Sequence, residues 1–423
     1  MKSFLKKTVR WYLYFLAKHR LKKINPTVIG ITGSIGKTTT KEAIATVLSE
    51  KFCVYQSKKS FNTDIGMLLA ILDLPSGFSS PISWIFILAR AAWNAFIQRA
   101  HYDFFVLEYG ADRPGDIDAL LKITQPHIGI ITGIAPVHIG EKQFKNTDAV
   151  FNEKKKLIAS LREKDFAIVN GDDHLLQQIS PLICNKHTYG FETNNEIFAD
   201  NIDEDLHGTT AVIHYKNKKF TVKLSVLGAQ HVLAVLPAIV IALHYKMELV
   251  RIQKALEKFS LPPGRMNKIA GINGSTLIDS SYNASLKTVE GALRLLKHLP
   301  ARRRIAVLGS MNELGALSES AHRQLGNIVP NTCDILVTVG KSAQFIAEET
   351  LKNGFPEGKM KSFDTAETAG QYLEAHLKKG DLVLFKGSQN DVRLERAIKM
   401  VMARPQDAHR LLCRQEAGWL KIL

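Results

Sequence analysis

A strand, a glycine loop and a helix follow one another between residues 27 and 50, and this order constrains the fold more than any other feature. The run "TVIGIT" is apolar and β-branched, as buried strands are, and the periodic segment from about Thr38 to Glu50 predicts a helix. Between them lies "GSIGKT" at 33 to 38, where backbone N–H groups and the helix dipole would attract an anion. We therefore predict a phosphate-binding loop at the edge of a parallel sheet.

The spacing of this loop differs from the common pattern G-x-x-x-x-G-K-[ST], because Ile31 stands where the first glycine would be. As an isolated string, G-x-x-G-K-T is only moderately specific. In this position Lys37 would reach the β- and γ-phosphates of a nucleotide, and the Thr38 hydroxyl would bind Mg²⁺. The loop alone leaves open whether the shorter spacing is a functional variant.

Length, charge and cysteine content narrow the class of protein. A chain of 423 residues is too long for one hydrophobic core, so we expect two or three domains. The formal net charge of +16 suits an anionic membrane face or phosphorylated substrates, and no motif supports a nucleic-acid partner. Four dispersed cysteines without a C-x-x-C pair favour a reducing cytosol, and we expect no secretory signal.

Alternating strands and helices predict an α/β fold with parallel sheets covered on both faces. Further strands are predicted at "FFVLEYGA", "HIGIITGI" and "FAIVNGDD", each followed by a polar loop of the kind in which such sheets bind ligands. A hairpin joins "AVIHY" to "FTVKL", two helices follow near 230–243 and 249–259, and "LPPGR" marks a boundary. A second α/β series then has strands at "TLIDSSYNA", "RIAVLGSMNELG", "DILVTVGKS" and "LVLFKGSQN".

Two apolar helical segments fall outside this alternation. Residues 82–100 have only a narrow polar stripe, and residues 4–18 gather their polar side chains on one face, at Lys7, Arg10, Tyr14 and Lys18. Apolar faces with aromatic and cationic margins are typical of helices lying in a membrane interface. Packing on the protein body or on each other is an equal alternative. Neither segment is expected to span a bilayer, which needs about 20 apolar residues.

The motifs that follow the glycine loop resemble the Mur ligase family in content and order. The family's phosphate loop has the shortened form T-G-[ST]-x-G-K-[ST], which residues 32–38 match, so the resemblance implies a functional variant. "SFNTDIGM", "LEYGADRPGDI", "GIAPVHIGE", "FNEKKKLI", "PPGRM", "IDSSYNA", "SESAHRQLG" and "KGSQN" are similar to further family motifs. The similarity spans roughly residues 26 to 402. It implies a P-loop ATPase domain in 26–263 and a Rossmann-like ligase domain in 264–423. The resemblance does not cover the basic amphipathic helix expected in residues 1–25 or the apolar helical insert at about 76–100, which we predict from the residues alone.

The resemblance implies ATP-dependent amide formation from a carboxylate and an amine through an acyl phosphate, with Mg²⁺ at two sites. "DSSYNA", "MNELG" and "KGS" are most similar to the members that add D-alanyl-D-alanine to a muramoyl tripeptide in peptidoglycan synthesis. One alternative is a related ligase acting on another carboxylate, such as a glutamyl chain. Another is a membrane-associated nucleotide-binding protein without ligase activity. We expect a cytoplasmic monomer, with peripheral contact to the inner membrane face through residues 4–18 and 82–100.

The resemblance also implies roles for single residues. With Lys37, the catalytic set would be Glu108 and His138 as Mg²⁺ ligands beside Thr38, and Lys154 as a carbamate made from CO₂. Without the resemblance, these would be a solvated carboxylate, a structural histidine and a solvated lysine. The implied nucleotide-binding residues are Thr32, Gly33, Ser34, Ile35, Gly36, Lys37, Thr38, Thr39, Arg265, Asp279, Tyr282 and Asn283. The implied substrate residues are Asn62, Thr63, Lys386, Ser388 and Asn390, and for the last three ordinary loop chemistry is an equal alternative.

Three departures from the family pattern concern the nucleotide and the substrate. Ala234 replaces the asparagine that usually binds adenine, which leaves nucleotide preference open. Ser280 and Ser310 stand where the family has carboxylates near the nucleotide. Only some 25 residues precede the first strand, where the family members of this type carry a domain that holds the UDP-sugar. The acceptor substrate is therefore the least constrained part of the prediction.

Overall fold

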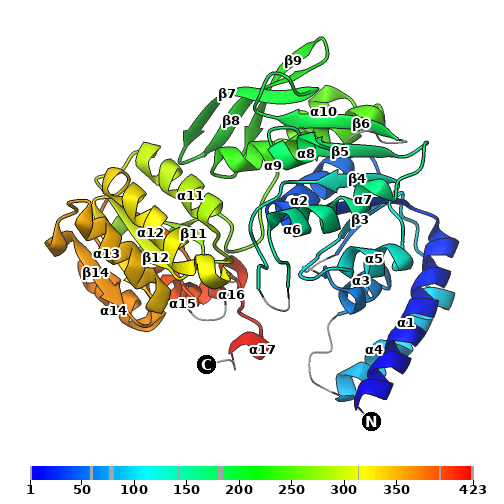
Figure 1. Ribbon diagram of the computed structural model, residues 1–423, viewed down its shortest axis with the longest axis horizontal. Coiled ribbons are helices and arrows are strands. Elements are labelled where there is room, and N and C mark those ends of the chain that lie inside the picture. The colour runs from blue at the N-terminus through cyan, green and yellow to red at the C-terminus, as the bar shows by residue number, and fades with distance from the viewer. Residues whose placement is uncertain are drawn as a thin grey trace. The chain divides into compact units, whose positions relative to one another are not determined.

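The computed structural model describes residues 2–57, 61–75, 81–140, 143–179, 184–312, 314–389 and 392–420, which form two compact units (Figure 1). The first unit comprises Met1–Asn201, Ala211–Lys223 and Val232–Phe259, and the second comprises Ile202–Thr210, Leu224–His231 and Ser260–Leu423. The predicted boundaries at residues 25 and 263 stay predictions. Asn390, Glu313 of the "MNELG" motif and residues 76–80 of the predicted insert lie outside the described residues.

The larger sheet has the strand order β2-β3-β1-β4-β5-β6-β7-β8-β9, and its strands from β2 to β7 pair in parallel. The strands are β1 Thr27–Thr32, β2 Val54–Gln56, β3 Phe104–Glu108, β4 Ile128–Ile131, β5 Phe166–Asn170, β6 Asn185–Gly190, β7 Ile197–Asp205, β8 Gly208–Tyr215 and β9 Lys218–Leu224. Parallel strands buried on both faces are expected to be continuous apolar runs, as β1, β3 and β4 are. The predicted α/β class is confirmed.

Helices connect these strands and cover the sheet. They are α1 Lys2–Ile24, α2 Lys37–Leu48, α3 Asp64–Ile71, α4 Pro81–Ala92 continued by the π-helical turn η1 Trp93–Ile97, α5 Asp116–Ile123, α6 Thr147–Lys154, α7 Lys156–Ala159, α8 His174–Gln177, α9 Ala229–His244 and α10 Leu249–Glu257. The strand β1 lies between β3 and β4, so the loops that follow these three strands lie together at one edge of the sheet.

The smaller sheet has the order β10-β11-β15-β12-β13-β14 and is parallel except for β10. Its strands are β10 Asn267–Ala270, β11 Thr276–Ser280, β12 Arg303–Gly309, β13 Ile335–Val339, β14 Met360–Phe363 and β15 Asp381–Lys386. Its helices are α11 Leu286–His298, α12 Ser318–Ile328, α13 Gln344–Lys352, α14 Ala366–His376, α15 Glu395–Val401, α16 Ala408–Leu411 and α17 Ala417–Leu420. The four strands predicted here are present, and the two edge strands β10 and β14 are additional.

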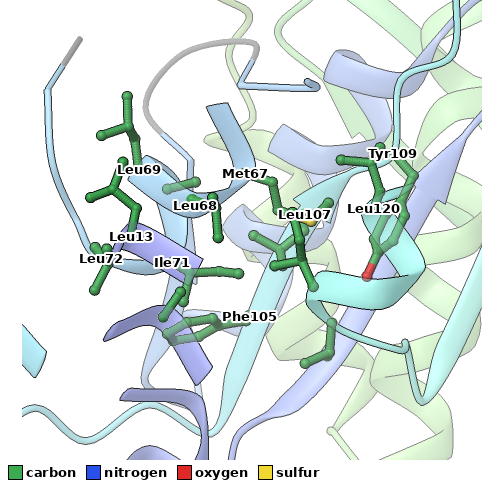
Figure 2. Packing of buried hydrophobic residues seen from close by; sticks show 14 of the residues in the cluster. Leu13, Met67, Leu68, Leu69, Ile71, Leu72, Phe105, Leu107, Tyr109 and Leu120 are labelled. Atoms are coloured by element: carbon green, nitrogen blue, oxygen red, sulfur yellow. The ribbon is translucent and has the colours of Figure 1, made fainter. Parts of the chain in front are cut away.

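One apolar core joins the N-terminal helix to the body of the first unit (Figure 2). Leu13 of α1 lies beside Leu68 and Ile71 of α3, and Phe105 of β3 lies beneath them (Figure 2). The helix α1 is thus one of the elements that pack on the body of the first unit, which was one of the two alternatives predicted for residues 4–18. Its opposite side is exposed. Among the described residues, no helix is long and apolar enough to cross a membrane.

Candidate active site

The phosphate loop connects β1 to α2 and is held against the loop that follows β4. Ser34 N donates to Gly133 O (2.8 Å), and the Thr132 hydroxyl donates to Ile35 O. Gly33 has a φ of 145°, and a Cβ built there would lie 2.0 Å from Thr132 Oγ1, so no side chain fits. The tight turn therefore requires glycine. It presents backbone donors at the N-terminus of α2, where an anion is favoured.

Two side chains of α2 face the end of β3. Thr38 Oγ1 lies 3.3 Å from Glu108 Oε2, and Lys41 Nζ lies 3.1 Å from Glu108 Oε1. Glu108 and Lys41 are both almost fully buried, and Lys41 also donates to Ser57 O (2.8 Å). A buried carboxylate needs such a partner, since burying an unpaired charge is costly. Glu108 is accordingly fixed beside the Thr38 hydroxyl, which is the pair of oxygen ligands predicted for Mg²⁺.

Lys37, the other loop cation, extends back across the loop. Its Nζ donates to Gly33 O (2.6 Å), and its positive charge helps to lower the pKa of the Lys154 amine. Thr32 at the end of β1 is buried and donates to Tyr109 O (2.7 Å), and Thr39 is buried in the first turn of α2. Gly36 precedes α2 with a left-handed φ of 86°. The predicted loop residues therefore form one compact turn from β1 into α2.

Lys154, the last residue of α6, is 1% exposed. Burial, together with the nearby charge of Lys37, lowers the pKa of its amine to about 7, against the opposing effects of Asp112, Glu153 and Asp116. Its neighbour Lys155 is exposed, so the three lysines of "KKK" differ sharply in environment. A lysine amine that is largely free near neutral pH can react with CO₂, which the ammonium form cannot do.

His138 lies in the loop after β4, with a φ of 56° that is uncommon for a residue other than glycine. Its Nε2 is 3.4 Å from Asp112 Oδ1, in the loop that follows β3. The negative charge of Asp112 also acts to raise the pKa of the Lys154 amine. Observed strain of this kind is concentrated at functional sites, which supports a role for the loop. His138, Asp112 and Lys154 thus gather on the side of the phosphate loop where β3 and β4 end.

The unmodified side chains of this cluster offer only a few metal ligands. Among the described residues, no group of three or more histidine, cysteine, aspartate or glutamate side chains is arranged to hold a metal ion. Thr38 and Glu108 fit one Mg²⁺, because both offer oxygen ligands and an ATP phosphate would complete the set. A second ion near His138 would need a further anion, and a carbamate on Lys154 would supply it.

The predicted substrate residues of the first unit lie beside the loop after β3. Gly110 N donates to Asn62 O (3.1 Å), and a Cβ at Gly110 would lie 2.7 Å from that oxygen. Thr63 is the N-cap of α3, and its side chain accepts from Gly66 N (3.2 Å). The chain segment that carries Asn62 is therefore held at the end of β3.

In the second unit, Asp279 is the second-last residue of β11, and Lys386 is the last residue of the neighbouring strand β15. Asp279 is fully buried, and burial raises the pKa of its carboxyl to about 6. Burial lowers the pKa of Lys386 to about 7, with a further contribution from the charge of Arg265. Lys386 Nζ donates to Asn283 O (2.8 Å) and Ser280 Oγ (3.2 Å). Shifts in opposite directions in one cluster are typical of functional sites.

Other predicted residues surround this cluster. The Arg265 guanidinium lies 4.2 Å from the centre of the Tyr282 ring, in a cation–π contact. The Asn283 side chain is exposed. Ser388 is buried and joins two loops, because its Oγ donates to Ala284 O (3.2 Å) and accepts from Asn312 N (3.0 Å). Lys386 and Ser388 thus make hydrogen bonds that hold loops together, which fits the alternative that their role is structural and not substrate binding.

The helix expected near the adenine carries unusual groups at its start. Ala234 is buried in α9 and offers no hydrogen bond to a base. His231 is also buried, and burial lowers the pKa of its imidazole to about 3, with help from the charges of Arg265 and Lys386. Its ring is therefore neutral, and its Nδ1 has no hydrogen-bond partner among the described residues.

Two models of protein families match the chain, the Mur ligase middle domain over residues 31–242 and the Mur ligase, glutamate ligase domain over residues 264–389. The chain belongs to the Mur ligase family. It is 29% identical over 392 residues to the UDP-N-acetylmuramoyl-tripeptide–D-alanyl-D-alanine ligase of Bacillus subtilis, a match covering 92% of this chain and 79% of that protein. The prediction of a Mur-type ligase is thereby confirmed.

Solved structures give the same result for the fold. The MurF ligase from Thermotoga maritima in complex with ADP superimposes with a TM-score of 0.76 at 26% identity, covering 94% of this chain and 84% of that one. The folylpolyglutamate synthase of Mycobacterium tuberculosis has a TM-score of 0.64 at 12% identity, covering 90% of this chain and 91% of that one. The latter likeness concerns the fold alone.

Sequence reasoning missed four residues of these clusters. Lys41 lies one helical turn after Lys37, and that spacing was the signal that it faces the same strand end. Asp112 stands at an unspecified position of the "LEYGADRPGDI" motif, and Thr132 gave no signal at all. In the second unit, Arg414 donates to Ser281 O and to Glu395 Oε2 (3.0 Å), and nothing in the C-terminal sequence indicated this contact.

Proposed function

We propose that this Mur ligase adds D-alanyl-D-alanine to a muramoyl-tripeptide precursor in peptidoglycan synthesis, using ATP. The acceptor carboxylate would attack the γ-phosphate and release ADP. The amine of the dipeptide would then displace phosphate from the acyl phosphate and form the amide. The named activity of the Bacillus subtilis relative supports this choice of substrates, and the motifs at 279–284 and 386–388 support it independently.

The observation that carries the proposal is the concentration of functional groups at one edge of the larger sheet. The phosphate loop, the Thr38–Glu108 pair and the buried amine of Lys154 lie on loops and helix ends that follow β1, β3 and β4. A protein that only binds nucleotide has no need of a buried amine beside Lys37. Acyl phosphate formation brings two anions together, and it therefore needs cations at this point.

We propose that Lys154 carries a carbamate in the active enzyme. The ammonium form would first lose one proton, and the free amine would then add to the carbon of CO₂ and lose a second proton, so that a cation is replaced by an anion. The lowered pKa supports this step because the amine is available near neutral pH. The product would suit the site, since it would remove the repulsion between Lys154 and Lys37 and supply an oxygen ligand near His138.

The residues present fit two Mg²⁺ ions under this proposal. Thr38 and Glu108 would hold one, and His138 with the Lys154 carbamate would hold the other. Bound Mg²⁺ neutralises phosphate charge during phosphoryl transfer. Lys37 would bind the β- and γ-phosphates, and the N-terminus of α2 would hold them in place.

We propose that the enzyme works as a monomer in the cytoplasm, where its nucleotide is available, and touches the inner membrane face through α1 and α4. The division into an ATPase domain at 26–263 and a ligase domain at 264–423 is part of the same proposal.

The test is release of ADP with UDP-muramoyl tripeptide and D-alanyl-D-alanine, compared between wild type, Lys154→Ala and the matched control Lys155→Ala. Lys155 is the exposed neighbour, so its variant removes the same charge without touching the buried cluster. We expect turnover that requires the dipeptide, is stimulated by bicarbonate, and is lost only in Lys154→Ala. With ¹³C-bicarbonate, a carbamate carbon signal should appear in wild type and Lys155→Ala alone.

Two results would redirect the proposal. ATP binding without ADP release for any muramoyl substrate would favour another carboxylate acceptor, for which glutamyl acceptors are the next to try. Equal turnover of wild type and Lys154→Ala would exclude the carbamate, whatever the substrate.

A further inference from the structure

The helices α1 and α4, with the turn η1, expose an unusual set of large apolar side chains. Of the ten large hydrophobic residues that are exposed in the described part of the chain, seven lie on these elements. They are Trp11 and Phe15 on α1, and Ile85, Phe86, Trp93, Phe96 and Ile97 on α4 and η1. Single exposed apolar residues are ordinary, whereas a contiguous group marks an interaction surface.

The two helices form one continuous surface because they run side by side in the same direction (Figure 1). Tyr12 OH donates to Leu88 O (3.3 Å), and one turn beyond Phe15 the ring of His19 contacts that of Phe96 in a tilted arrangement, with 4.6 Å between centroids. Near the end of α1, Lys23 Nζ donates to Phe96 O (2.8 Å). These contacts join the two elements along most of their shared length, so their exposed sides face solvent together.

Only one side of this pair is needed for the fold. Leu13, Leu16 and Ala17 of α1 are buried in the core of the first unit, as are Ile87 and Ala91 of α4. The exposed residues lie on the other side of each helix, where no described residue covers them. Phe86 is 71% exposed, Trp11 68% and Trp93 57%, so these rings contribute little to folding.

The charged residues in the sequences of α1, α4 and η1 are all cationic. The sequence of α1 contains several lysines and arginines but no aspartate or glutamate, and α4 with η1 contains Arg90 and no acidic residue. Lys7, Lys18 and Lys22 are exposed and fall on the helical stripe of Trp11 and Phe15, at spacings of three and four residues. Cationic residues are thus interleaved with aromatic ones rather than set apart from them.

We propose that the surface formed by α1, α4 and η1 docks on an anionic lipid bilayer. Aromatic and aliphatic side chains would enter the headgroup region while the lysines contact lipid phosphates, as in helices that lie in a membrane interface. A second copy of this chain fits less well, because pairing the surface with itself would bring like charges together. Neither helix is long and apolar enough to cross the bilayer, so the contact is peripheral.

The test is flotation of the full chain with vesicles of phosphatidylcholine mixed with phosphatidylglycerol, and with vesicles of phosphatidylcholine alone. We expect flotation with the mixed vesicles, strong reduction with the neutral ones, and weakening by salt. The variant Phe86→Ser/Trp93→Ser should lower the partition coefficient by about tenfold or more for each ring removed. Lys18→Gln/Lys22→Gln should lower it by about fivefold for each charge.

The matched control is Val250→Ser, because Val250 is 59% exposed but lies on α10, away from this surface. It should float like wild type. Folding of every variant is checked by circular dichroism, and the substituted side chains are exposed enough to leave it intact. Fluorescence gives a second measure: quenching by brominated lipids should reach Trp11 and Trp93, and should fall in Trp11→Phe/Trp93→Phe, which keeps flotation.

Several outcomes would overturn the proposal. Absence of flotation with mixed vesicles would do so, as would equal flotation of the Phe86→Ser/Trp93→Ser variant. If sedimentation showed a dimer that these substitutions convert to a monomer, the surface would be an interface between copies. A monomer that binds no vesicles would point to a protein partner. None of these measurements depends on the proposed ligase activity.

Discussion

Replacing Lys154 by methionine should stabilise the folded protein while removing its proposed function. The amine has an ordinary pKa of 10.5, which is lowered to about 7 in the fold, chiefly by burial. At 1.36 kcal/mol per pH unit, this difference corresponds to about 5 kcal/mol by which the fold disfavours the ammonium form. Methionine has a similar length and no charge, so the variant should avoid most of this cost.

The sign follows from proton linkage. Between about pH 7 and pH 10.5, the unfolded chain binds the proton of Lys154 and the folded chain does not, so the free energy of unfolding rises with pH. Below about pH 7 both states bind it, and the full cost of about 5 kcal/mol applies. The advantage of Lys154→Met should therefore be largest near pH 6 and fall to about 2 kcal/mol near pH 9.

The assay is urea unfolding followed by circular dichroism at several pH values, in CO₂-free buffer with chelator and without nucleotide. Lys155→Met is the control, because its amine is exposed and its replacement should produce no comparable difference between pH 6 and pH 9. A Lys154→Met protein less stable than wild type near pH 7 would refute the reasoning. So would a stability difference that does not change with pH.

Two further predictions concern the groups beside Lys154. Lys41→Met should lower the free energy of unfolding by about 3–5 kcal/mol, because it leaves the buried Glu108 carboxylate without its cation. Urea unfolding of Lys41→Met/Glu108→Gln should recover most of that loss, and an equally unstable double variant would contradict the pairing. Gly33→Ala should cost about 1–3 kcal/mol and abolish ADP binding measured by calorimetry, because its Cβ would lie 2.0 Å from Thr132 Oγ1. Retained ADP affinity in a folded Gly33→Ala protein would show that the loop tolerates a different turn.

The sequence predicted the elements that depend on local pattern. The apolar run before "GSIGKT" and the periodic segment after it became β1 and α2, because a buried parallel strand is a continuous apolar run and a helix that packs on a sheet has a recognisable period. The edge strands β10 and β14 were missed because their sequences lack such a pattern. "NKIA" and "MKSF" are short and mix polar with apolar residues, since an edge strand is buried on fewer sides, and such a pattern does not differ from that of a loop.

The candidate site was predictable as a set of loops but not as a set of contacts. The resemblance implied that Thr38 and Glu108 share a metal site, and the observed strand order places the ends of β1, β3 and β4 together. Lys41 and Asp112 could not be predicted, because which side chain neutralises a buried carboxylate or faces a histidine depends on rotamers and on distances in the folded chain. The pattern of the sequence contains neither.

Lys154 shows most clearly how burial bears on the proposed mechanism. In the sequence it is one of three adjacent lysines, all of which would be expected on the surface. Only the resemblance to the family assigns a role to Lys154 and not to the other two. In the fold, α6 ends at Lys154 and α7 begins at Lys156, and the amine of Lys154 is buried while Lys155 is exposed to solvent. Burial makes the ammonium form unstable, and the same instability makes the free amine available for CO₂. The energy that the fold loses at this position is therefore the source of the reactivity that the proposed mechanism requires.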